Sequence, residues 1–504
     1  MRRLLIFAAA PVLLLAIAAI ILAMAGGHSP DPDYAYFFNG LEILDLHPPS
    51  YYDHPGTPVE MLAALAILVT WLVRLPLDGA SILASAVARP EVYLNVINAG
   101  LVLTAAAALL WLGQRCWRAT GRMTVALAGQ FSIFLSFPAM TALNRVTSEP
   151  LLVAASFALA AFAVPILLGQ APADRRAARM LGALLGFAIA TKYTALPLLA
   201  AILFLPGKSL WKQAALFAAG SFILFTLPTA HHYPQMGFAL FRFATRQGAY
   251  GSGAVGVPGG DALLEHGIAL LRQAPEVFIF AAVYWGAFAL GPLRARRLFG
   301  VSALILTLQI LMCLKAAEAR YLTPVVGVMA LANAGLVFYA GTRRLRALVA
   351  GLLTAAIASN GLSVSAWARD MRIVNDNDQA LLRQMTAQGC ALVPFYMVKL
   401  PTYNLDFGNQ FTNNHFGAAL RQHLPHVVSY DIARKEFSAF GEPVAVDQVR
   451  TRLAHPGCVR LVGWPVERHG ATIGLAPQSL TPVGRSSHAG YEIVVYDFRP
   501  FQQP

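Results

Sequence analysis

Two aspartates stand directly after an apolar N-terminal run, in the segment Pro-Asp-Pro-Asp-Tyr-Ala-Tyr-Phe-Phe-Asn-Gly at residues 30–40. A carboxylate at the edge of a membrane can take a proton from a hydroxyl group, so Asp33 is a candidate general base. The pattern also has a structural interpretation, because an aspartate after proline often caps a helix. In that case one of the two acids is the N-cap of a helix that starts near Tyr34.

The composition places these acids in a membrane protein. Of the 504 residues, 57% are hydrophobic and 12% are charged, which is too apolar for an ordinary soluble domain. In such a chain the net charge of +13 bears on membrane topology and not on nucleic-acid binding. The four cysteines show no CxxC or Cys/His spacing, so neither a structural zinc site nor redox chemistry is indicated.

Eleven apolar runs are suited to crossing a bilayer. The first is longer than the apolar part of a usual signal peptide, so we expect an uncleaved helix, with a cleaved signal peptide as the alternative. Two short runs flank Lys192, which predicts a thin, tilted or broken pair there. The runs are 4–25, 93–112, 123–139, 150–168, 180–191, 194–206, 214–230, 274–292, 298–314, 321–341 and 346–366.

The run at 58–75 decides the topology. If it is a surface or partly embedded helix on the outer side of the membrane and does not span it, the main Lys/Arg clusters between spans all fall on the cytoplasmic side. We therefore expect a cytoplasmic N-terminus, a periplasmic C-terminus and a transmembrane domain at 1–366. Its exterior loops are then 26–92 and 231–273, and the glycine-rich stretch 248–260 is a mobile loop.

Residues 367–504 predict a small α/β domain outside the membrane. Hydropathy falls here, strand-like runs begin at Cys390, Cys458 and Tyr491, and helical patterns cover 376–388 and 445–454. The two cysteines form a disulfide in an oxidising compartment or stay as two buried thiols. The polar and aromatic stretch 404–416 is expected to be a loop, with a segment that contacts carbohydrate as the alternative.

On this topology several cations violate the positive-inside pattern and face the acids of the outer side. Charges at membrane depth are costly unless paired, so Lys192 and Arg320 suggest a bound anion such as a lipid phosphate. The alternative is that they pair with acids of the bundle or extend to the surface. The cations outside the pattern are Lys192, Arg242, Arg246, Lys315 and Arg320.

A family resemblance rests on five segments that occur in the order DYAYFFNG, DHPGTP, NRVTSEPLL, ATKYTALPLL and EARYLTPVV. Together they resemble the C-type (GT-C) membrane glycosyltransferases, the superfamily of protein O-mannosyltransferases and lipid A aminoarabinose transferases. The resemblance covers roughly residues 1–340. It implies that Asp33, with Tyr36 three residues on, is the active-site aspartate of the first exterior loop. Tyr34 stands where the family usually has a second acid, so Asp31 or Asp53 is expected to take that role.

The same resemblance implies supporting residues. His54 is similar to the histidine of the family's His-Pro-Pro motif, with a hydrogen-bonded loop histidine as the alternative. Glu149 resembles the acid near the donor phosphate or a divalent ion, with helix capping before Pro150 as the alternative. The divalent ion, Mg²⁺ or Mn²⁺, has Asp33 and Glu149 as its candidate ligands.

The residues expected at the donor phosphate come from later segments. The resemblance implies contacts to lipid phosphate from two pairs, Lys192 with Tyr193 and Arg320 with Tyr321. Arg242 or Arg246 is expected to help from the loop that contains 248–260, which is able to close over bound substrate.

The expected function is an inverting transfer of a sugar from a polyprenyl-phosphate donor to a glycan, lipid or protein acceptor, on the periplasmic side of a bacterial inner membrane. The alternative from another class is a transporter or flippase of a lipid-linked sugar, since cations that face a lipid phosphate serve either function. Transporters tend to show paired broken helices in inverted repeats, and the sequence indicates one such pair.

Overall fold

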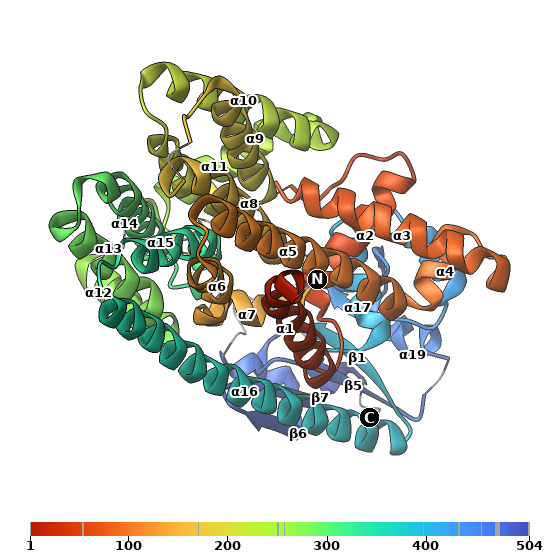
Figure 1. Ribbon diagram of the computed structural model, residues 1–504. Coiled ribbons are helices and arrows are strands. Elements are labelled where there is room, and N and C mark those ends of the chain that lie inside the picture. The colour runs from red at the N-terminus through yellow and green to blue at the C-terminus, as the bar shows by residue number, and fades with distance from the viewer. Residues whose placement is uncertain are drawn as a thin grey trace. The chain divides into compact units, whose positions relative to one another are not determined.

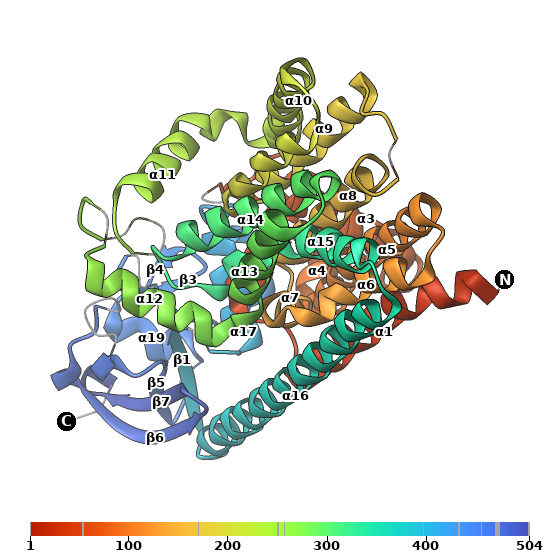
Figure 2. The same cartoon turned by 60° about the vertical axis from the view of Figure 1, so that its left-hand side comes forward.

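The computed structural model describes residues 2–501 except 53, 54, 170, 249, 250, 252, 257, 397, 432, 433, 455 and 469–473. The chain is mostly helical, and the strands described all follow residue 389 (Figures 1 and 2). It forms two compact units. The first unit contains Met1–Ala19, Tyr52–Val59 and Asn98–Ser365, and the second contains Ile20–Tyr51, Glu60–Ile97 and Ala366–Pro504.

Four helices begin in one unit and end in the other: α1 (Arg2–Met24), α3 (Thr57–Asp78), α5 (Pro90–Thr120) and α16 (Arg343–Ala387). The rest of the first unit is helical. Its elements are α6 (Met123–Phe131), η2 (Ser132–Leu135), α7 (Phe137–Ala142), α8 (Ser148–Leu167), α9 (Arg175–Thr191), η3 (Tyr193–Phe204), α10 (Lys208–Thr226), η4 (Leu227–His232), α11 (Tyr233–Thr245), α12 (Gly260–Gln273), α13 (Pro275–Leu290), α14 (Leu293–Cys313), η6 (Ala319–Val325) and α15 (Val326–Tyr339).

The chain is a multi-pass membrane protein. Within the described residues, 8 helices are long and apolar enough to cross a bilayer, and up to 9 crossings result if α12 and α13, which meet at a 96° bend, form one span. All eleven predicted runs coincide with helices, but 123–139, 180–191 and 194–206 fall on short or broken ones. The helix at Thr57–Asp78, interpreted from the sequence as a surface helix, is one of the 8 by length and composition.

The predicted break near Lys192 is confirmed. Helix α9 ends at Thr191, Lys192 is extended with φ −166° and ψ 139°, and the chain continues as a 3₁₀ helix of 12 residues, η3. A 3₁₀ stretch of this length is uncommon and often marks a functional or strained segment. A second 3₁₀ segment, η6, contains Arg320 and leads into α15. Lys192 and Arg320 therefore both lie where regular α-helix is interrupted.

Helix α9 is held against α10 by two glycines, as Figure 1 shows for the two neighbouring ribbons. A Cβ at Gly182 or Gly186 would collide with the carbonyl oxygens of Ala214 and Ala218. Small residues four positions apart let two apolar helices approach closely inside a lipid bilayer. This contact fixes the helix that ends directly before Lys192.

Helix α16 differs from the sequence prediction. A span at 346–366 and a separate helix at 376–388 were expected, but α16 is one helix of 45 residues, seen as the long ribbon in Figure 2. Residues 367–375 contain neither glycine nor proline, so nothing in them ends the helix. The change in hydropathy near residue 366 therefore does not mark a break in secondary structure.

The second unit contains two sheets. Its main sheet has the order β1-β5-β7-β6, with β1 and β5 parallel and the other neighbours antiparallel, and its small sheet has the order β2-β3-β4. The strands are β1 (Cys390–Tyr396), β2 (Ser429–Asp431), β3 (Glu436–Ala439), β4 (Glu442–Pro443), β5 (Cys458–Gly463), β6 (Leu480–His488) and β7 (Tyr491–Phe498). The three strands predicted from the sequence are β1, β5 and β7.

The remaining helices of this unit come from residues 30–88 and from residues 401–501. They are η1 (Pro30–Tyr34), α2 (Ala35–Leu44), α4 (Ile82–Ala88), α17 (Pro401–Gln410), α18 (Gly417–His423), η7 (Val446–Gln448), α19 (Val449–Arg452), η8 (Pro477–Ser479) and η9 (Arg499–Phe501). Phe38 packs on Phe416, and Tyr51 packs on Phe411, with ring centroids 5.8 and 4.9 Å apart. The loop expected at 404–416 is wrong for residues 404–410, which belong to the largely buried helix α17 with Pro401 in its first turn, whereas residues 411–416 are turns.

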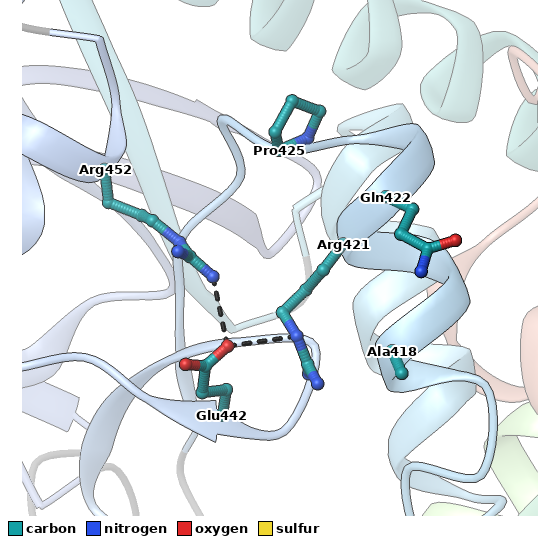
Figure 3. A pocket seen from close by; sticks show the side chains of 6 residues that line it. All are labelled: Ala418, Arg421, Gln422, Pro425, Glu442 and Arg452. Carbon is teal, nitrogen blue, oxygen red and sulfur yellow. Dashed lines mark hydrogen bonds and ion pairs between the residues drawn. The ribbon is translucent and has the colours of Figure 1, made fainter.

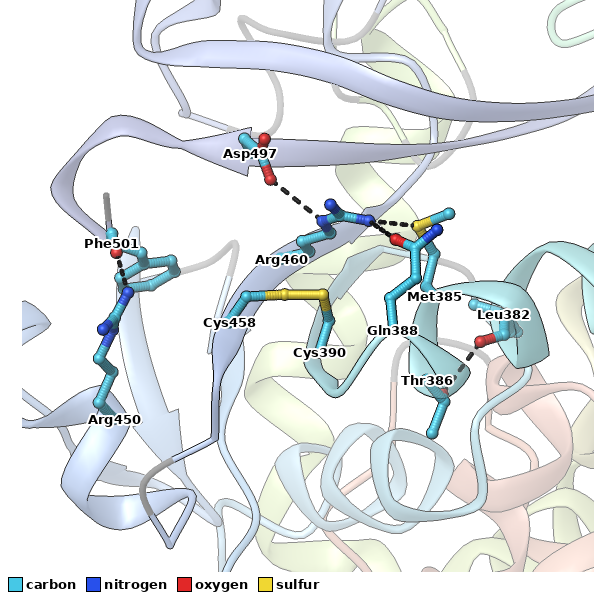
Figure 4. The surroundings of a disulfide bond; sticks show 10 residues. All are labelled: Leu382, Met385, Thr386, Gln388, Cys390, Arg450, Cys458, Arg460, Asp497 and Phe501. Atoms are coloured by element: carbon cyan, nitrogen blue, oxygen red, sulfur yellow. Dashed lines mark hydrogen bonds and ion pairs between the residues drawn. A yellow bond between two sulfur atoms is a disulfide. The ribbon is translucent and has the colours of Figure 1, made fainter. Parts of the chain in front are cut away.

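Cys390 and Cys458 form a disulfide between the first residues of the parallel strands β1 and β5 (Figure 4). The two residues are paired in the sheet register, with Cα atoms 4.4 Å apart. Cys116 and Cys313 are free and buried.

We predict that reduction of this disulfide destabilises the C-terminal sheet. The bond closes a loop between residues 68 apart, for which chain entropy gives a loss of about 4 kcal/mol. Thermal unfolding, followed by tryptophan fluorescence, should begin at lower temperature with reductant or in Cys458→Ser. In the control variant Cys116→Ser, which keeps the disulfide, reductant should still lower the unfolding temperature. An unchanged unfolding curve of the wild-type protein under reductant would contradict the prediction.

Candidate active site

The first cluster of candidate residues surrounds Asp33 in the second unit. Asp33 lies in the turn η1 and is only 1% exposed. Its Oδ2 accepts a hydrogen bond from the Ser29 amide at 2.7 Å and lies 3.5 Å from His28 Nδ1. Helix α2 has Tyr34 as its N-cap residue, with no side-chain capping bond. The Asp33 carboxylate thus faces back toward the residues that precede it in the loop.

His28 is a partner of Asp33 that the sequence analysis missed. Its Nε2 lies 3.1 Å from Asn95 Oδ1, which fixes the ring against α5. Burial lowers the pKa of His28, but the hydrogen bond and charge of Asp33 outweigh burial, so the pKa is raised above 6.5. The available sequence signal was its place in the same short loop, five residues before Asp33.

Glu91 is the second acid near this turn, and it also went unnoticed in the sequence. The Tyr34 hydroxyl donates to Glu91 Oε1 at 2.9 Å, and Glu91 contributes its charge to the raised pKa of His28. Tyr34 stands where the resemblance expects an acid. The structure thus supplies a carboxylate beside that tyrosine from the first turn of α5.

The other first-loop candidates have separate outcomes. Asp31 is half-buried in η1 with non-helical backbone angles, and Tyr36 is buried with its ring 5.5 Å from that of Tyr51. Asp53 and His54 lie outside the described residues. The roles expected for these four residues stay predictions.

The second cluster lies in the first unit and centres on a buried ion pair. Lys192 Nζ lies 2.5 Å from Glu149 Oε1, and the two residues are 4% and 2% exposed. Glu149 Oε2 accepts hydrogen bonds from the hydroxyls of Thr147 and Ser148. Lys192 therefore has an acid of the bundle as its partner, which is the structural alternative raised from the sequence. Glu149 lies in the first turn of α8 and faces this lysine.

Tyr321 connects Lys192 to Arg320. Lys192 Nζ lies 5.1 Å and Arg320 Cζ 5.4 Å from the centroid of the Tyr321 ring, and Arg320 also pairs with Glu318 at 3.4 Å. Both distances are within the range of cation–π attraction. Gln309 of α14 joins the two 3₁₀ segments, because its Nε2 donates to the carbonyls of Thr194 in η3 and Tyr321 in η6, at 2.9 and 2.6 Å.

A cavity of about 260 Å³ opens beside this cluster. Lys315 contributes to its wall, and the Nζ of this lysine is buried with no hydrogen-bond partner among the described residues. The sequence analysis noted Lys315 as an exception to the positive-inside pattern but did not place it in the site. The cavity wall combines polar groups with apolar side chains: Lys192, Tyr193, Thr194, Leu196, Leu240, Phe243, Ala244, Gly248, Gly251, Met312, Lys315, Ala316 and Tyr321.

Arg242 and Arg246 flank this cavity without being part of its described wall. Arg242 lies on α11 with its guanidinium 5.5 Å from the centroid of Phe238, while Leu240 and Phe243 of the same helix line the cavity. Arg246 follows the end of α11 and forms an isolated antiparallel bridge with Val255. Their predicted contacts with a phosphate stay a prediction.

The divalent-cation site expected from the sequence stays a prediction. No three His, Cys, Asp or Glu side chains among the described residues lie close enough together to hold a metal ion. Asp33 and Glu149 belong to different units, and Glu149 already has Lys192 as its partner. No chemical step is therefore assigned to a metal ion here.

The sequence matches no protein-family model and no curated protein. The structure is similar to the crystal structure of ArnT from Cupriavidus metallidurans in the apo state, with a TM-score of 0.52, 14% identity and 98% of each chain covered. The ArnT structure bound to undecaprenyl phosphate aligns with a TM-score of 0.47, 14% identity and 96% and 97% of the two chains covered. The match to apo ArnT extends over nearly the whole length of both chains.

This similarity shows the fold. The chain has a fold similar to that of ArnT, with a polytopic helical membrane domain followed by a small strand-containing C-terminal part, as the sequence predicted. The structure brings Glu149, Lys192, Tyr193 and Tyr321 together, with Arg320 beside them. Asp33 and Asp31 lie in the other unit. Convergence of the two clusters in one pocket stays a prediction.

We predict that Glu149 and Lys192 stabilise the bundle only as a pair. Glu149→Gln or Lys192→Met alone leaves one buried charge without its partner, which should cost about 3–5 kcal/mol. The double variant removes both charges and should recover most of that loss. Thermal unfolding in detergent measures the coupling, and additive losses in the double variant would contradict it.

Proposed function

We propose that the protein is a membrane glycosyltransferase that moves a sugar from a polyprenyl-phosphate donor to an acceptor hydroxyl. The observation that carries this proposal is the cavity lined by Lys192, Lys315 and Tyr321 in a chain with the fold of ArnT. A lipid phosphate has an anionic head and an apolar chain, and the cavity wall offers cations together with apolar side chains. The resemblance of five sequence segments to GT-C enzymes supports the same substrate class.

Lys315 is the cation best suited to the phosphate. Lys192 is compensated by Glu149, so it has little unbalanced charge to offer an incoming anion. The Lys315 ammonium has no hydrogen-bond partner among the described residues, although its Nζ is buried. When the bond between the anomeric carbon and the phosphate breaks, negative charge grows on the phosphate, and a fixed ammonium group stabilises it. Arg320, Tyr193 and Tyr321 complete the proposed phosphate site.

Asp33 is the proposed general base. It takes the proton of the acceptor hydroxyl while the hydroxyl oxygen attacks the anomeric carbon, and polyprenyl phosphate leaves from the opposite face. A single displacement of this kind inverts the anomeric configuration. The Ser29 amide and His28 orient the carboxylate. Asp31 and Asp53 are proposed to shape this site, with His54 nearby in sequence.

The proposed location is a bacterial inner membrane, with the C-terminal part in the periplasm and the N-terminus in the cytoplasm. The disulfide between Cys390 and Cys458 supports an oxidising compartment for the C-terminal part. The proposed partners are the lipid-linked donor and a glycan, lipid or protein acceptor. Activity assays with a chelator, and with Mg²⁺ or Mn²⁺ restored, decide whether a divalent ion takes part.

The test of the proposal is an assay of purified protein with labelled polyprenyl-phosphate sugars and candidate acceptors. An enzyme releases free polyprenyl phosphate only when acceptor is present. A flippase moves the intact lipid-linked sugar across a vesicle membrane without releasing it, so that result would replace the enzyme with the transporter.

Lys315→Met should raise the KM for the donor by about tenfold or more, because a charge-assisted contact to phosphate is lost. The matched control is Lys212→Met on α10, which removes a lysine that does not line the cavity. An unchanged donor KM in Lys315→Met would remove this lysine from the phosphate site.

Asp33→Asn should lower the transfer rate by about two to four orders of magnitude, since an amide cannot take the acceptor proton. The variant should still be expressed and fold, because the amide oxygen can accept the Ser29 hydrogen bond, and its thermal stability should fall because the ionic contact with His28 is lost. Full activity in this variant would exclude Asp33 as the base.

The activity should fall as pH rises through the raised pKa of His28. His28 is charged below its raised pKa and neutral above it, so its ionic contact with Asp33 is lost on the alkaline side and the fall lies on the alkaline limb of the kcat/KM profile. His28→Asn should remove this limb. His488→Asn, which alters a histidine paired with Asp370, is the control and should keep it.

A further inference from the structure

A second cavity, of about 370 Å³, lies in the C-terminal part of the chain (Figure 3). Helix α18 provides Arg421 and Gln422, and Arg452 comes from the end of α19. Glu442 of β4 faces both arginines across the cavity. The full lining consists of Ala418, Arg421, Gln422, Pro425, Glu442 and Arg452.

The two guanidinium groups share one carboxylate oxygen. Arg421 Nε lies 3.0 Å and Arg452 Nη2 lies 3.1 Å from the same atom, Glu442 Oε2. Two positive charges therefore face one negative charge, and the cavity keeps an excess of one positive charge. All three side chains are partly exposed, so the excess charge is accessible from solvent.

The arginines are held in place by the surrounding backbone. Arg421 Nη1 donates to the Phe440 carbonyl at 3.1 Å, which fixes the plane of the guanidinium group. Gly417 permits this approach, because a Cβ there would collide with the Phe440 carbonyl and lie 3.2 Å from Arg421 Nη1. On the other side of the cavity, Arg452 Nε is buried without a hydrogen-bond partner among the described residues. Such a donor is costly to bury unless something binds it.

The shape and chemistry of this cavity suit a charged sugar. A guanidinium group offers parallel donors that match the oxygens of a carboxylate or phosphate. Gln422 adds a polar side chain to the lining, while Pro425 and Ala418 offer apolar surface to a sugar ring. A volume of 370 Å³ falls within the range of about 300–1,000 Å³ typical of small-molecule sites.

We propose that this cavity binds a saccharide through a phosphate or carboxylate group that Arg421 and Arg452 recognise. The identification of this saccharide as part of the acceptor rests on the proposed function, whereas the binding does not. The acceptor class is then an acidic glycan. Glu442 competes with the ligand for the two arginines and lowers its affinity.

The role of Glu442 gives the sharpest test. If Arg421, Arg452 and Glu442 form only structural ion pairs, Glu442→Gln removes those contacts and does not increase the affinity for any sugar. If the cavity is an anion site, the same change frees both guanidinium groups and should tighten binding by about tenfold. Arg421→Gln and Arg452→Gln should weaken binding by a similar factor.

Titration calorimetry on the purified full-length protein measures this with four probes: glucose 6-phosphate, glucuronic acid, glucose and inorganic phosphate. The first two should bind, glucose should not bind measurably, and inorganic phosphate should bind more weakly than glucose 6-phosphate. Arg485→Gln is the matched control, because Arg485 pairs with Glu492 and Glu467 in the same unit but does not line the cavity. Arg421→Lys keeps the positive charge but lacks the parallel N–H donors of the guanidinium group. Its affinity for glucose 6-phosphate should lie between those of the wild-type protein and Arg421→Gln. This graded result would not be expected if the variants had simply failed to fold.

Equal binding of glucose and glucose 6-phosphate, unchanged binding in both arginine variants, or weaker binding in Glu442→Gln would overturn the proposal. Inorganic phosphate that binds as tightly as glucose 6-phosphate would overturn its saccharide part. The titrations contain no donor, so sugar binding without transfer activity refutes only the proposed glycosyltransferase. Normal transfer with an unchanged acceptor KM in the arginine variants refutes only the assignment to the acceptor.

Discussion

The buried pair of Lys192 and Glu149 is the interaction on which the membrane part of the structure depends. Two charges inside an apolar bundle are costly to desolvate, and the pair is tolerated because each charge compensates the other and two hydroxyl groups complete the hydrogen bonding of Glu149. The pair ties the start of α8 to the point where α9 stops. Tyr321 and Gln309 extend this connection to the second interrupted helix, so the cavity wall forms around a fixed charge centre.

The sequence predicts those parts of the site that depend on local patterns. Two short apolar runs around a lysine were enough to predict the break at Lys192, because span length is a local property. The partner of that lysine is 43 residues away, and no pattern within one segment selects Glu149 over pairing with a bound anion. His28 was missed for a related reason, since a single loop histidine carries no spacing signal. Lys315 was visible as a misplaced charge, but its place in a cavity wall depends on the packing of α11.

The two errors in the C-terminal half have one cause. Composition changes near residue 366, and the stretch 404–416 is polar, so both were interpreted as ends of regular structure. Helix formation responds to backbone propensity and capping, and not to hydropathy alone. Helix α16 therefore continues through the change in composition, and α17 forms because Pro401 starts it and because packing buries Leu405, Gly408 and Asn409.

The packing of α17 also bears on the role of the C-terminal part. A Cβ at Gly408 would collide with the backbone of Tyr34 and with the Phe38 ring, so α17 approaches the first loop as closely as two backbones allow. Asn39 adds a hydrogen bond to the Phe411 carbonyl at 3.3 Å. Asp33 directly precedes Tyr34, and its turn is thus held by the C-terminal helices as well as by Ser29 and His28. The C-terminal part is therefore a structural support of the proposed base and not only a cover or a separate binding module.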